Sequence, residues 1–104
     1  MILEIWTDDE TKHIETEKYK GAWHKVWHRD NGPAFVMYDN NVKIKEIWCK
    51  HGEYHREDGP AYIVWKSHKL LEPESVQQIW YMNDHRLSDD EVEKQKIKLL
   101  MQKI

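Results

Sequence analysis

Two copies of one phrase, HRDNGPA at residues 28–34 and HREDGPA at residues 55–61, decide how this chain of 104 residues folds. Five of the seven positions are identical, the other two are conservative substitutions, and the copies lie 27 residues apart. A period of that length is typical of repeat architectures, in which each unit is one supersecondary structure. The sequence therefore predicts a short internal repeat.

Each copy combines a turn signal with the start of a strand. Asp58 can hydrogen-bond to nearby backbone N–H groups, Gly59 can take conformations closed to other residues, and Pro60 has no N–H and suits the first position of a strand. Beyond the prolines, side chains alternate over residues 34–38 and 61–65 as in strands with at least one buried face. Residues 39–41 favour a hairpin, which predicts that residues 42–50 return antiparallel to residues 34–38.

A tripeptide marks the strand that precedes each turn. It reads EIW at residues 4–6, EIW at residues 46–48 and QIW at residues 78–80. One unit is therefore expected to contain a strand ending near a tryptophan, a tight turn, the His-Arg segment, a second turn and a strand that opens with alanine. Residues 66–75, which include Pro73, predict a longer exposed connection inside the second unit.

The C-terminal end changes to helical periodicity. Ser88 followed by Glu91 forms a capping box, and acidic residues in the first turn suit the helix dipole. The apolar residues that follow fall on one helical stripe, namely Ile97, Leu100, Met101 and Ile104. We expect an amphipathic helix over residues 88–104 whose stripe packs on the sheet or on a partner.

Composition narrows the class of protein. The chain has the length of one small domain, and its formal net charge of -3 comes from acidic and basic residues that are interspersed. Duplex nucleic acid would need clustered positive charge, so we expect no such partner. The single cysteine, Cys49, cannot form an internal disulfide, and no apolar run predicts a signal peptide or membrane span, which favours the cytoplasm.

The aromatic-rich strand followed by His-Arg-(acid)-Asp-Gly-Pro-Ala resembles the MORN-like repeat proteins that carry HRxDGPA units in bacteriophages, large DNA viruses and some bacteria. The resemblance covers roughly residues 21–91, and the segment from Trp80 into residues 88–91 resembles the way such proteins end, with Asp84 where glycine is usual. It implies antiparallel strands and a family whose members mostly lack an assigned activity. If the chain is viral, the implied location is the host cytoplasm.

We therefore predict a mainly β (α+β) fold, an antiparallel β-meander built from MORN-like repeats and closed by a C-terminal amphipathic α-helix. It forms a single domain, with an N-terminal strand region at residues 1–20, the repeat meander at residues 21–87 and the helix at residues 88–104.

Histidine spacing raises the question of a metal. His24 and His28 are four residues apart, and so are His51 and His55. On an extended strand four residues span about 13 Å, which is too far for one shared ion. A turn at Gly52 could bring His51 back towards His55, but strand-face histidines stacked on tryptophans are the simpler interpretation. We expect no metal and no cofactor.

The repeated His-Arg pairs allow three interpretations. Each arginine can pair with the acid that follows or lie over a tryptophan and so hold the turn. Alternatively, the two pairs form an anion site beside tryptophans, which would suit a nucleotide. The third interpretation is acid–base chemistry on a phosphodiester, with His28 beside Asp30 and His55 beside Glu57 or Asp58.

We predict a non-enzymatic protein-binding factor, a phage or viral accessory protein that binds and inhibits a host defence protein. Two complete repeats leave apolar surface uncovered, so we also predict a homodimer. The alternative is a protein that binds or sequesters a nucleotide, and the third possibility is a His-dependent phosphodiesterase. The candidate partner- or ligand-binding residues are Trp27, His28, Arg29, Trp48, His55, Arg56, Trp65 and Trp80.

Overall fold

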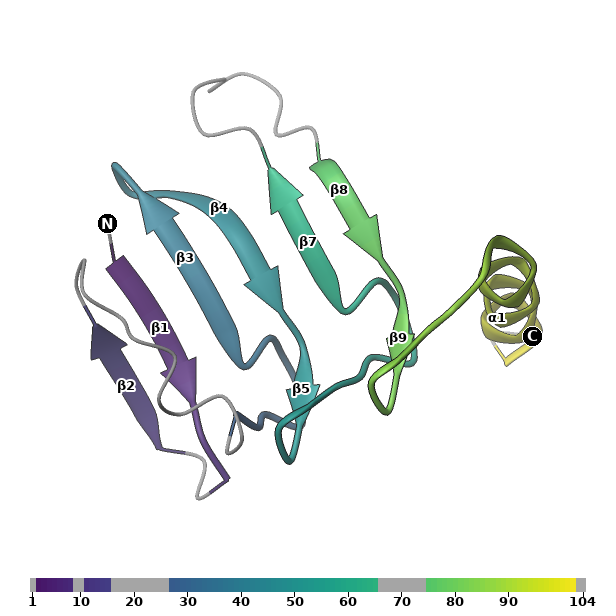
Figure 1. The fold of residues 1–104 in the computed structure, drawn as a ribbon, viewed down its shortest axis with the longest axis horizontal. Helices are drawn as coiled ribbons and strands as arrows, with labels where there is room; N and C mark the ends of the chain where they lie inside the picture. Colours follow the sequence, from purple (N-terminus) through teal and green to yellow (C-terminus); the bar gives the residue numbers. More distant parts are fainter. Residues whose placement is uncertain (1, 9–10, 16–26, 66–74, 103–104) are drawn as a thin grey trace.

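The computed structural model describes residues 2–8, 11–15, 27–65 and 75–102, and these form antiparallel β-sheet with one C-terminal helix. Six strands make the main sheet in the order β2–β1–β3–β4–β7–β8 (Figure 1). Their bounds are Ile2–Trp6 (β1), Lys12–Glu15 (β2), Phe35–Asp39 (β3), Val42–Ile47 (β4), Tyr62–Trp65 (β7) and Ser75–Ile79 (β8). The predicted mainly β architecture with a C-terminal helix is confirmed.

Two short hairpins extend from this sheet. β5 (Cys49–Lys50) pairs with β6 (Glu53–Tyr54), and β9 (Tyr81–Met82) pairs with β10 (His85–Arg86). They continue the chain beyond β4 and β8, as Figure 1 shows. The predicted return strand over residues 42–50 is therefore divided, because Trp48 leaves the main sheet and begins a separate hairpin.

The N-terminal strands belong to the same sheet. β1 lies between β2 and β3, with Ile5 opposite both His13 and Phe35. This order departs from a simple meander, in which β2 would separate β1 from β3. Ile5 is fully buried in the main apolar cluster, which also contains Leu3, Trp27, Ala34, Phe35, Ile47 and Cys49. The tripeptide at residues 4–6 thus supplies the first unit of the repeat.

Backbone hydrogen bonds reveal a third, altered unit. The Trp6 carbonyl accepts from the N–H of His28 at 3.0 Å, and the Trp48 carbonyl accepts from that of His55 at 3.0 Å. In the third unit the Trp80 carbonyl accepts from the N–H of Leu87 at 2.9 Å. Leu87 and the following Ser88 therefore occupy the places of the repeated histidine and arginine. The repeat ends at Ser88, and the helix begins at the next residue.

Helix α1 (Asp89–Gln102) starts as predicted. The Ser88 N–H donates to Glu91 Oε1 at 3.0 Å, and the Glu91 N–H donates to Ser88 Oγ at 3.3 Å. These bonds lower the pKa of the Glu91 carboxyl below its ordinary value, with the backbone bond from Ser88 as the largest cause. Within the described residues no helix is long and apolar enough to cross a membrane.

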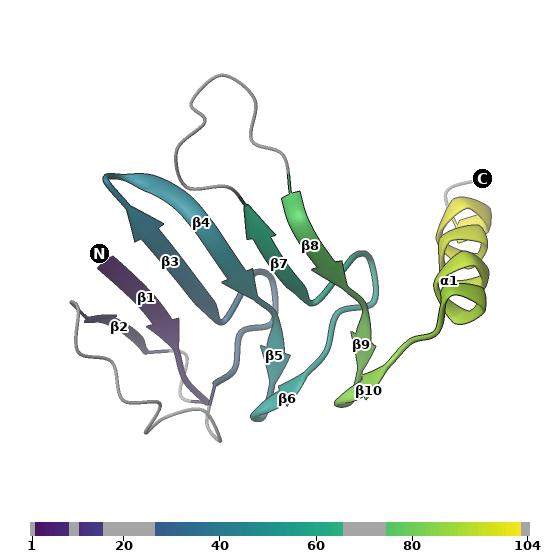
Figure 2. The same cartoon turned by 45° about the horizontal axis from the view of Figure 1, so that its top comes forward.

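The predicted stripe of α1 does not pack on the sheet. Ile97, Leu100 and Met101 are 54%, 66% and 68% exposed, and Ile104 lies outside the described residues. The half-buried side of the helix is a different one, with Val92, Gln95 and Leu99. Figures 1 and 2 show α1 standing beyond the β8–β9 side of the sheet. The predicted connection at residues 66–75 lies almost entirely outside the described residues.

Candidate functional site

The two repeated histidines are buried and hold the hairpin of the next unit. His28 Nδ1 accepts the backbone N–H of His51 at 3.0 Å, and His55 Nδ1 accepts that of Asn83 at 3.1 Å. Their Nε2 atoms lie 3.1 Å from Asp30 Oδ1 and 3.6 Å from Glu57 Oε1, respectively. An accepting Nδ1 in a neutral ring places the proton on Nε2, where it faces the carboxylate. Both nitrogens of His28 are therefore engaged inside the chain, whereas His55 is held through Nδ1, with its Nε2 farther from the carboxylate.

The turns that these histidines hold are tight and left-handed. His51 and Gly52 have φ angles of 50° and 82°, and Asn83 and Asp84 have φ angles of 49° and 65°. Two successive positive φ angles are those of a type I′ hairpin turn. Asp84 stands at the place that Gly52 has in the preceding turn, and its Oδ1 accepts the N–H of Tyr54 at 2.6 Å. The side chain thus ties the last hairpin to the one before it.

The repeated arginines lie over tryptophans of the preceding strand. Arg29 Cζ is 4.0 Å from the centre of the Trp6 ring, and Arg56 Cζ is 3.8 Å from that of Trp48. Each guanidinium also donates across its own turn, to the carbonyls of Pro33 at 3.4 Å and Pro60 at 3.2 Å. The interpretation that each arginine holds a turn through a cation–π contact is confirmed.

The repeated glycines are required for a different reason from the one expected. Neither Gly32 nor Gly59 has a positive φ; within the described part of the chain Gly52 is the glycine that does. A Cβ atom at Gly59 would lie 2.8 Å from Arg56 Cζ, and one at Gly32 would lie 2.8 Å from Arg29 Cζ. Each guanidinium is therefore enclosed between a tryptophan ring and a glycine backbone.

A Gly59→Ala substitution tests this packing. We expect it to lower the free energy of unfolding by about 1–2 kcal/mol, because the new methyl group pushes Arg56 off the Trp48 ring. In an Arg56→Ala background the same substitution should cost close to nothing. Urea unfolding of the four proteins in this double-mutant cycle measures the coupling. A cost that persists without the arginine would mean that glycine is needed for its backbone freedom.

A glutamate accompanies each arginine–tryptophan layer, and it is buried at Glu46 and half-buried at Glu4. Glu46 Oε1 accepts from Trp48 Nε1 at 2.8 Å and lies 3.8 Å from Arg56, while Lys43 Nζ reaches Glu46 Oε2 at 3.3 Å. Glu4 occupies the equivalent place in the first unit and binds Lys12 and the Tyr38 hydroxyl. The Lys12 hydrogen bond is the largest cause that holds the pKa of Glu4 below its ordinary value.

The third unit has lost both charges of this layer. Gln78 replaces the glutamate, and Ser88 replaces the arginine. In the second unit the two charges lie 3.8 Å apart, and Arg56 also pairs with Asp58 at 2.8 Å. The charged residues of this layer therefore have a structural role. Their loss in the third unit is visible in the sequence as the change from EIW at residues 46–48 to QIW at residues 78–80.

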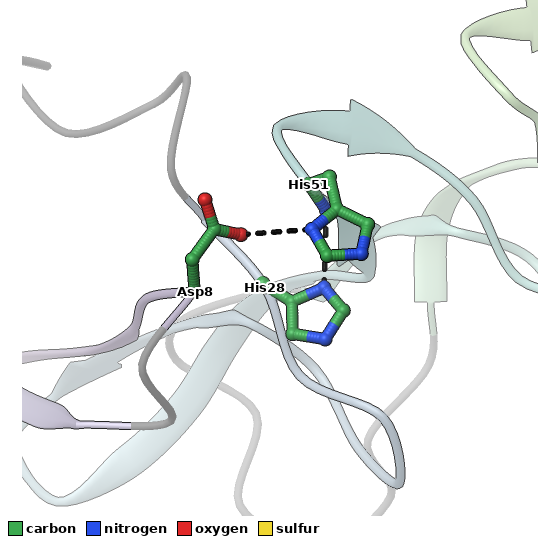
Figure 3. A group of neighbouring side chains, drawn as sticks. All are labelled: Asp8, His28 and His51. Atoms are coloured by element: carbon green, nitrogen blue, oxygen red, sulfur yellow. Dashed lines mark hydrogen bonds and ion pairs between the residues drawn. The ribbon is translucent and has the colours of Figure 1, made fainter.

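One cluster within the described residues has metal-ligand types. Asp8, His28 and His51 offer ligand atoms within 4.8 Å of one another (Figure 3). The two imidazole rings are stacked with centroids 4.2 Å apart, and Asp8 Oδ1 lies 3.1 Å from His51 Nδ1. His28 Nδ1 already accepts a backbone N–H, so an ion would have to break the contact that the second unit also makes through His55. The hydrogen bond from the His51 N–H to His28, which holds the hairpin turn, accounts for the proximity of the two histidines.

The suggestion that His51 turns back towards His55 is wrong. His51 lies on His28 instead, because the hairpin of the second unit folds onto the first unit. His24 lies outside the described residues. Of the two four-residue spacings, only His51–His55 lies within the described residues, and there His51 contacts His28.

A groove of about 500 Å³ lies between the two arginine turns and α1. Its lining includes four of the candidate residues, Arg29, Trp48, His55 and Arg56. Helix α1 contributes Lys98 and Leu99, and β5 contributes Lys50. The sequence did not identify these three residues, because nothing in the local pattern shows where the helix lies relative to the turns.

The remaining candidate residues do not line this groove. Trp27 and Trp80 are 4% and 9% exposed, so they belong to the interior and not to a binding surface. His28 is buried, and Trp65 is half-buried in β7. Burial raises the pKa of the Cys49 thiol to about 12, which removes it as a nucleophile at neutral pH and agrees with its predicted place inside the sheet.

Comparisons with protein-family models, curated proteins and solved structures give no match for this chain.

Proposed function

We propose that this protein is a non-catalytic binding factor that contacts a protein partner through the exposed face of α1. One observation carries the proposal: Ile97, Leu100 and Met101 are all more than half exposed and lie at helical spacing on one face. None of the residues described in α1 is buried. Contiguous exposed apolar side chains on a helix are typical of a surface that a partner covers.

The two ends of α1 differ in charge, while Lys94, Lys96 and Lys98 lie between them. Asp89, Asp90 and Glu91 fill the first turn, and no basic residue is present in the last turn of the described helix. A partner with an apolar groove flanked by basic side chains complements this arrangement. Helix-in-groove binding uses anchors at such spacings.

The repeat contacts support a scaffold over an enzyme. In both units the histidine, arginine and glycine of the phrase are engaged with neighbouring turns and strands. In each ring Nδ1 accepts a backbone N–H and is therefore not free to act as a general base, while Nε2 lies beside a carboxylate of the chain. We accordingly propose a MORN-like scaffold of phage or viral origin that inhibits a host defence protein in the host cytoplasm.

The test replaces two exposed side chains of α1. An Ile97→Ser/Leu100→Ser protein should bind the partner about 100-fold more weakly, because two apolar side chains no longer leave water on binding. Lys98→Ser, on the groove side of the same helix, is the matched control and should retain the affinity. The partner is first captured from host lysate and then purified for titration calorimetry. Equal affinity of wild type and double variant would contradict the proposal.

Native mass measurement of the same proteins tests the predicted homodimer. A wild-type dimer that becomes a monomer in the Ile97→Ser/Leu100→Ser variant would identify a second copy as the occupant of the α1 face. A monomeric wild type would leave that face to a different protein.

The groove supports a second candidate, a nucleotide-binding protein. It brings Arg29 and Arg56 together with Lys50, Lys98 and the Trp48 ring. Phosphate suits the cations, and an aromatic face suits a base. Because the arginines also hold the turns, the better test is Lys50→Glu/Lys98→Glu, which should abolish binding of ATP in calorimetry. Ile97→Ser should leave it unchanged, and absence of ATP binding by the wild type would exclude this function for ATP.

A further inference from the structure

We infer that the groove between the arginine turns and α1 is a phosphate-binding site, in which Arg29 binds the anion and Asn31 leaves Arg29 free to do so. The inference rests on the groove proposed above as a nucleotide site and deepens that proposal, since it names the part of the ligand that binds. It is independent of the exposed face of α1. Every residue that lines the groove belongs to the described part of the chain.

The two arginine turns differ at one acidic position. In the second unit Asp58 Oδ1 accepts from Arg56 Nε at 2.8 Å, so a carboxylate of the turn already neutralises this guanidinium. Asn31 stands at the place of Asp58 in the first unit, because the two phrases read HRDNGPA and HREDGPA. An amide carries no charge, and among the described residues no carboxylate lies at ion-pair distance from Arg29.

The Arg29 guanidinium is held in place without being neutralised. Its Cζ lies 4.0 Å from the centre of the Trp6 ring, and its Nη1 donates to the Pro33 carbonyl at 3.4 Å. Glu4, the glutamate of this layer, binds Lys12 at 2.6 Å instead. A positioned guanidinium that still has N–H groups to donate is suited to bidentate binding of an anion.

The charges that line the groove leave several cations without a partner. The lining contains four cations and three carboxylates. Each carboxylate faces a group of its own turn, at 3.1 Å for Asp30 and His28, 3.6 Å for Glu57 and His55, and 2.8 Å for Asp58 and Arg56. The other three cations, Arg29, Lys50 and Lys98, have no carboxylate at ion-pair distance in the part of the chain that the structure describes.

These three cations favour a phosphate group over a carboxylate. A carboxylate brings one negative charge, whereas a phosphate ester brings about 1.5 to 2 at neutral pH. Arginine binds phosphate with its planar fork, and lysine binds it as a point charge. A groove of about 500 Å³ is within the range of sites for small molecules.

The lining gives a base less to recognise than it gives a phosphate. It contains one tryptophan, Trp48, and Arg56 Cζ already covers one face of this ring at 3.8 Å. The phosphate end of a small molecule is therefore the part that the groove binds.

Exchanging the two turn residues tests the site with sequences that the chain itself uses. Asn31→Asp copies the second turn and should weaken the binding of inorganic tripolyphosphate about tenfold, because the new carboxylate pairs with Arg29 and repels the anion. Asp58→Asn copies the first turn and should tighten binding about two- to fivefold, because Arg56 loses a competing carboxylate. Titration calorimetry of the full-length proteins at one fixed ionic strength measures both changes.

The matched control adds the same charge elsewhere. Asn40→Asp, in the turn between β3 and β4, lies outside the lining of the groove and should leave the affinity unchanged. Urea unfolding of each variant separates a change in affinity from a loss of folding. The inference would be overturned by a wild type that does not bind tripolyphosphate, by equal effects of Asn31→Asp and Asn40→Asp, or by weaker binding in Asp58→Asn.

Three further ligands separate this inference from the nucleotide proposal. ATP should compete with tripolyphosphate, adenosine should not, and citrate, a tricarboxylate, should bind more weakly than tripolyphosphate. Tripolyphosphate binding without ATP binding would support the phosphate site and exclude the nucleotide function for ATP. Equal affinities for ATP and adenosine would keep the nucleotide function and overturn this inference, as would equal affinities for citrate and tripolyphosphate. The Ile97→Ser/Leu100→Ser protein should bind tripolyphosphate normally, whatever becomes of the α1 proposal.

Discussion

Replacing His55 with alanine is expected to lower the free energy of unfolding by about 2–4 kcal/mol. The buried ring accepts the Asn83 N–H at 3.1 Å and is only 8% exposed. Its removal leaves a donor without its acceptor and opens a space under the last hairpin. Urea unfolding followed by tryptophan fluorescence measures the loss.

Two further substitutions separate the hydrogen bond from the packing. His55→Asn keeps an acceptor at the δ position and should recover part of the lost stability. His85→Ala removes an exposed histidine from β10 and should change the free energy of unfolding by less than about 0.5 kcal/mol. If His55→Ala lowered the free energy of unfolding as little as His85→Ala, His55 would not hold the hairpin. A role of His55 in binding or catalysis would then be the better interpretation.

Glu46→Ala is expected to cost about 2–3 kcal/mol in the free energy of unfolding. The Glu46 carboxylate is 8% exposed and accepts from Trp48 Nε1 at 2.8 Å while it faces Arg56. Alanine leaves the indole N–H without this acceptor and removes one of the two carboxylates near the guanidinium, the other being Asp58 at 2.8 Å. Thermal and urea unfolding both report the change.

Glu46→Gln is the matched control, because the chain itself carries glutamine at this place in its third unit. The amide oxygen of glutamine can still accept a hydrogen bond from Trp48 Nε1. The loss in the free energy of unfolding should therefore fall to about 1 kcal/mol, which is the difference between hydrogen bonds to a charged and to a neutral acceptor. In an Arg56→Ser background, which copies the pair Gln78 and Ser88, Glu46→Gln should cost less still. An equal loss of unfolding free energy in both backgrounds would show that Glu46 and Arg56 do not stabilise each other.

The strands, the hairpin at Asn40 and Asn41 and the capping box at Ser88 were predictable from local chemistry. Asn40 and Asn41 adopt φ angles of 50° and 65°, which asparagine tolerates better than most residues. The role of Gly59 was not predictable in this way, because it depends on the close approach of the Arg56 guanidinium to the glycine backbone. A sequence does not show the distance between a backbone atom and a side chain three residues away. The suggestion that the turn at Gly52 brings His51 back towards His55 was wrong for the same reason, since His51 lies on His28.

The sequence by itself determined that this protein is a repeat of antiparallel strands with a capped helix after it, because period, turn chemistry and capping are encoded within a few neighbouring residues. Tertiary structure alone decided that the repeated histidines point into the next hairpin, that β1 lies beside β3 and that the apolar stripe of α1 faces outward. Those features depend on contacts between residues more than 20 positions apart, such as His28 with His51. Local patterns do not contain such contacts, because chain folding creates them.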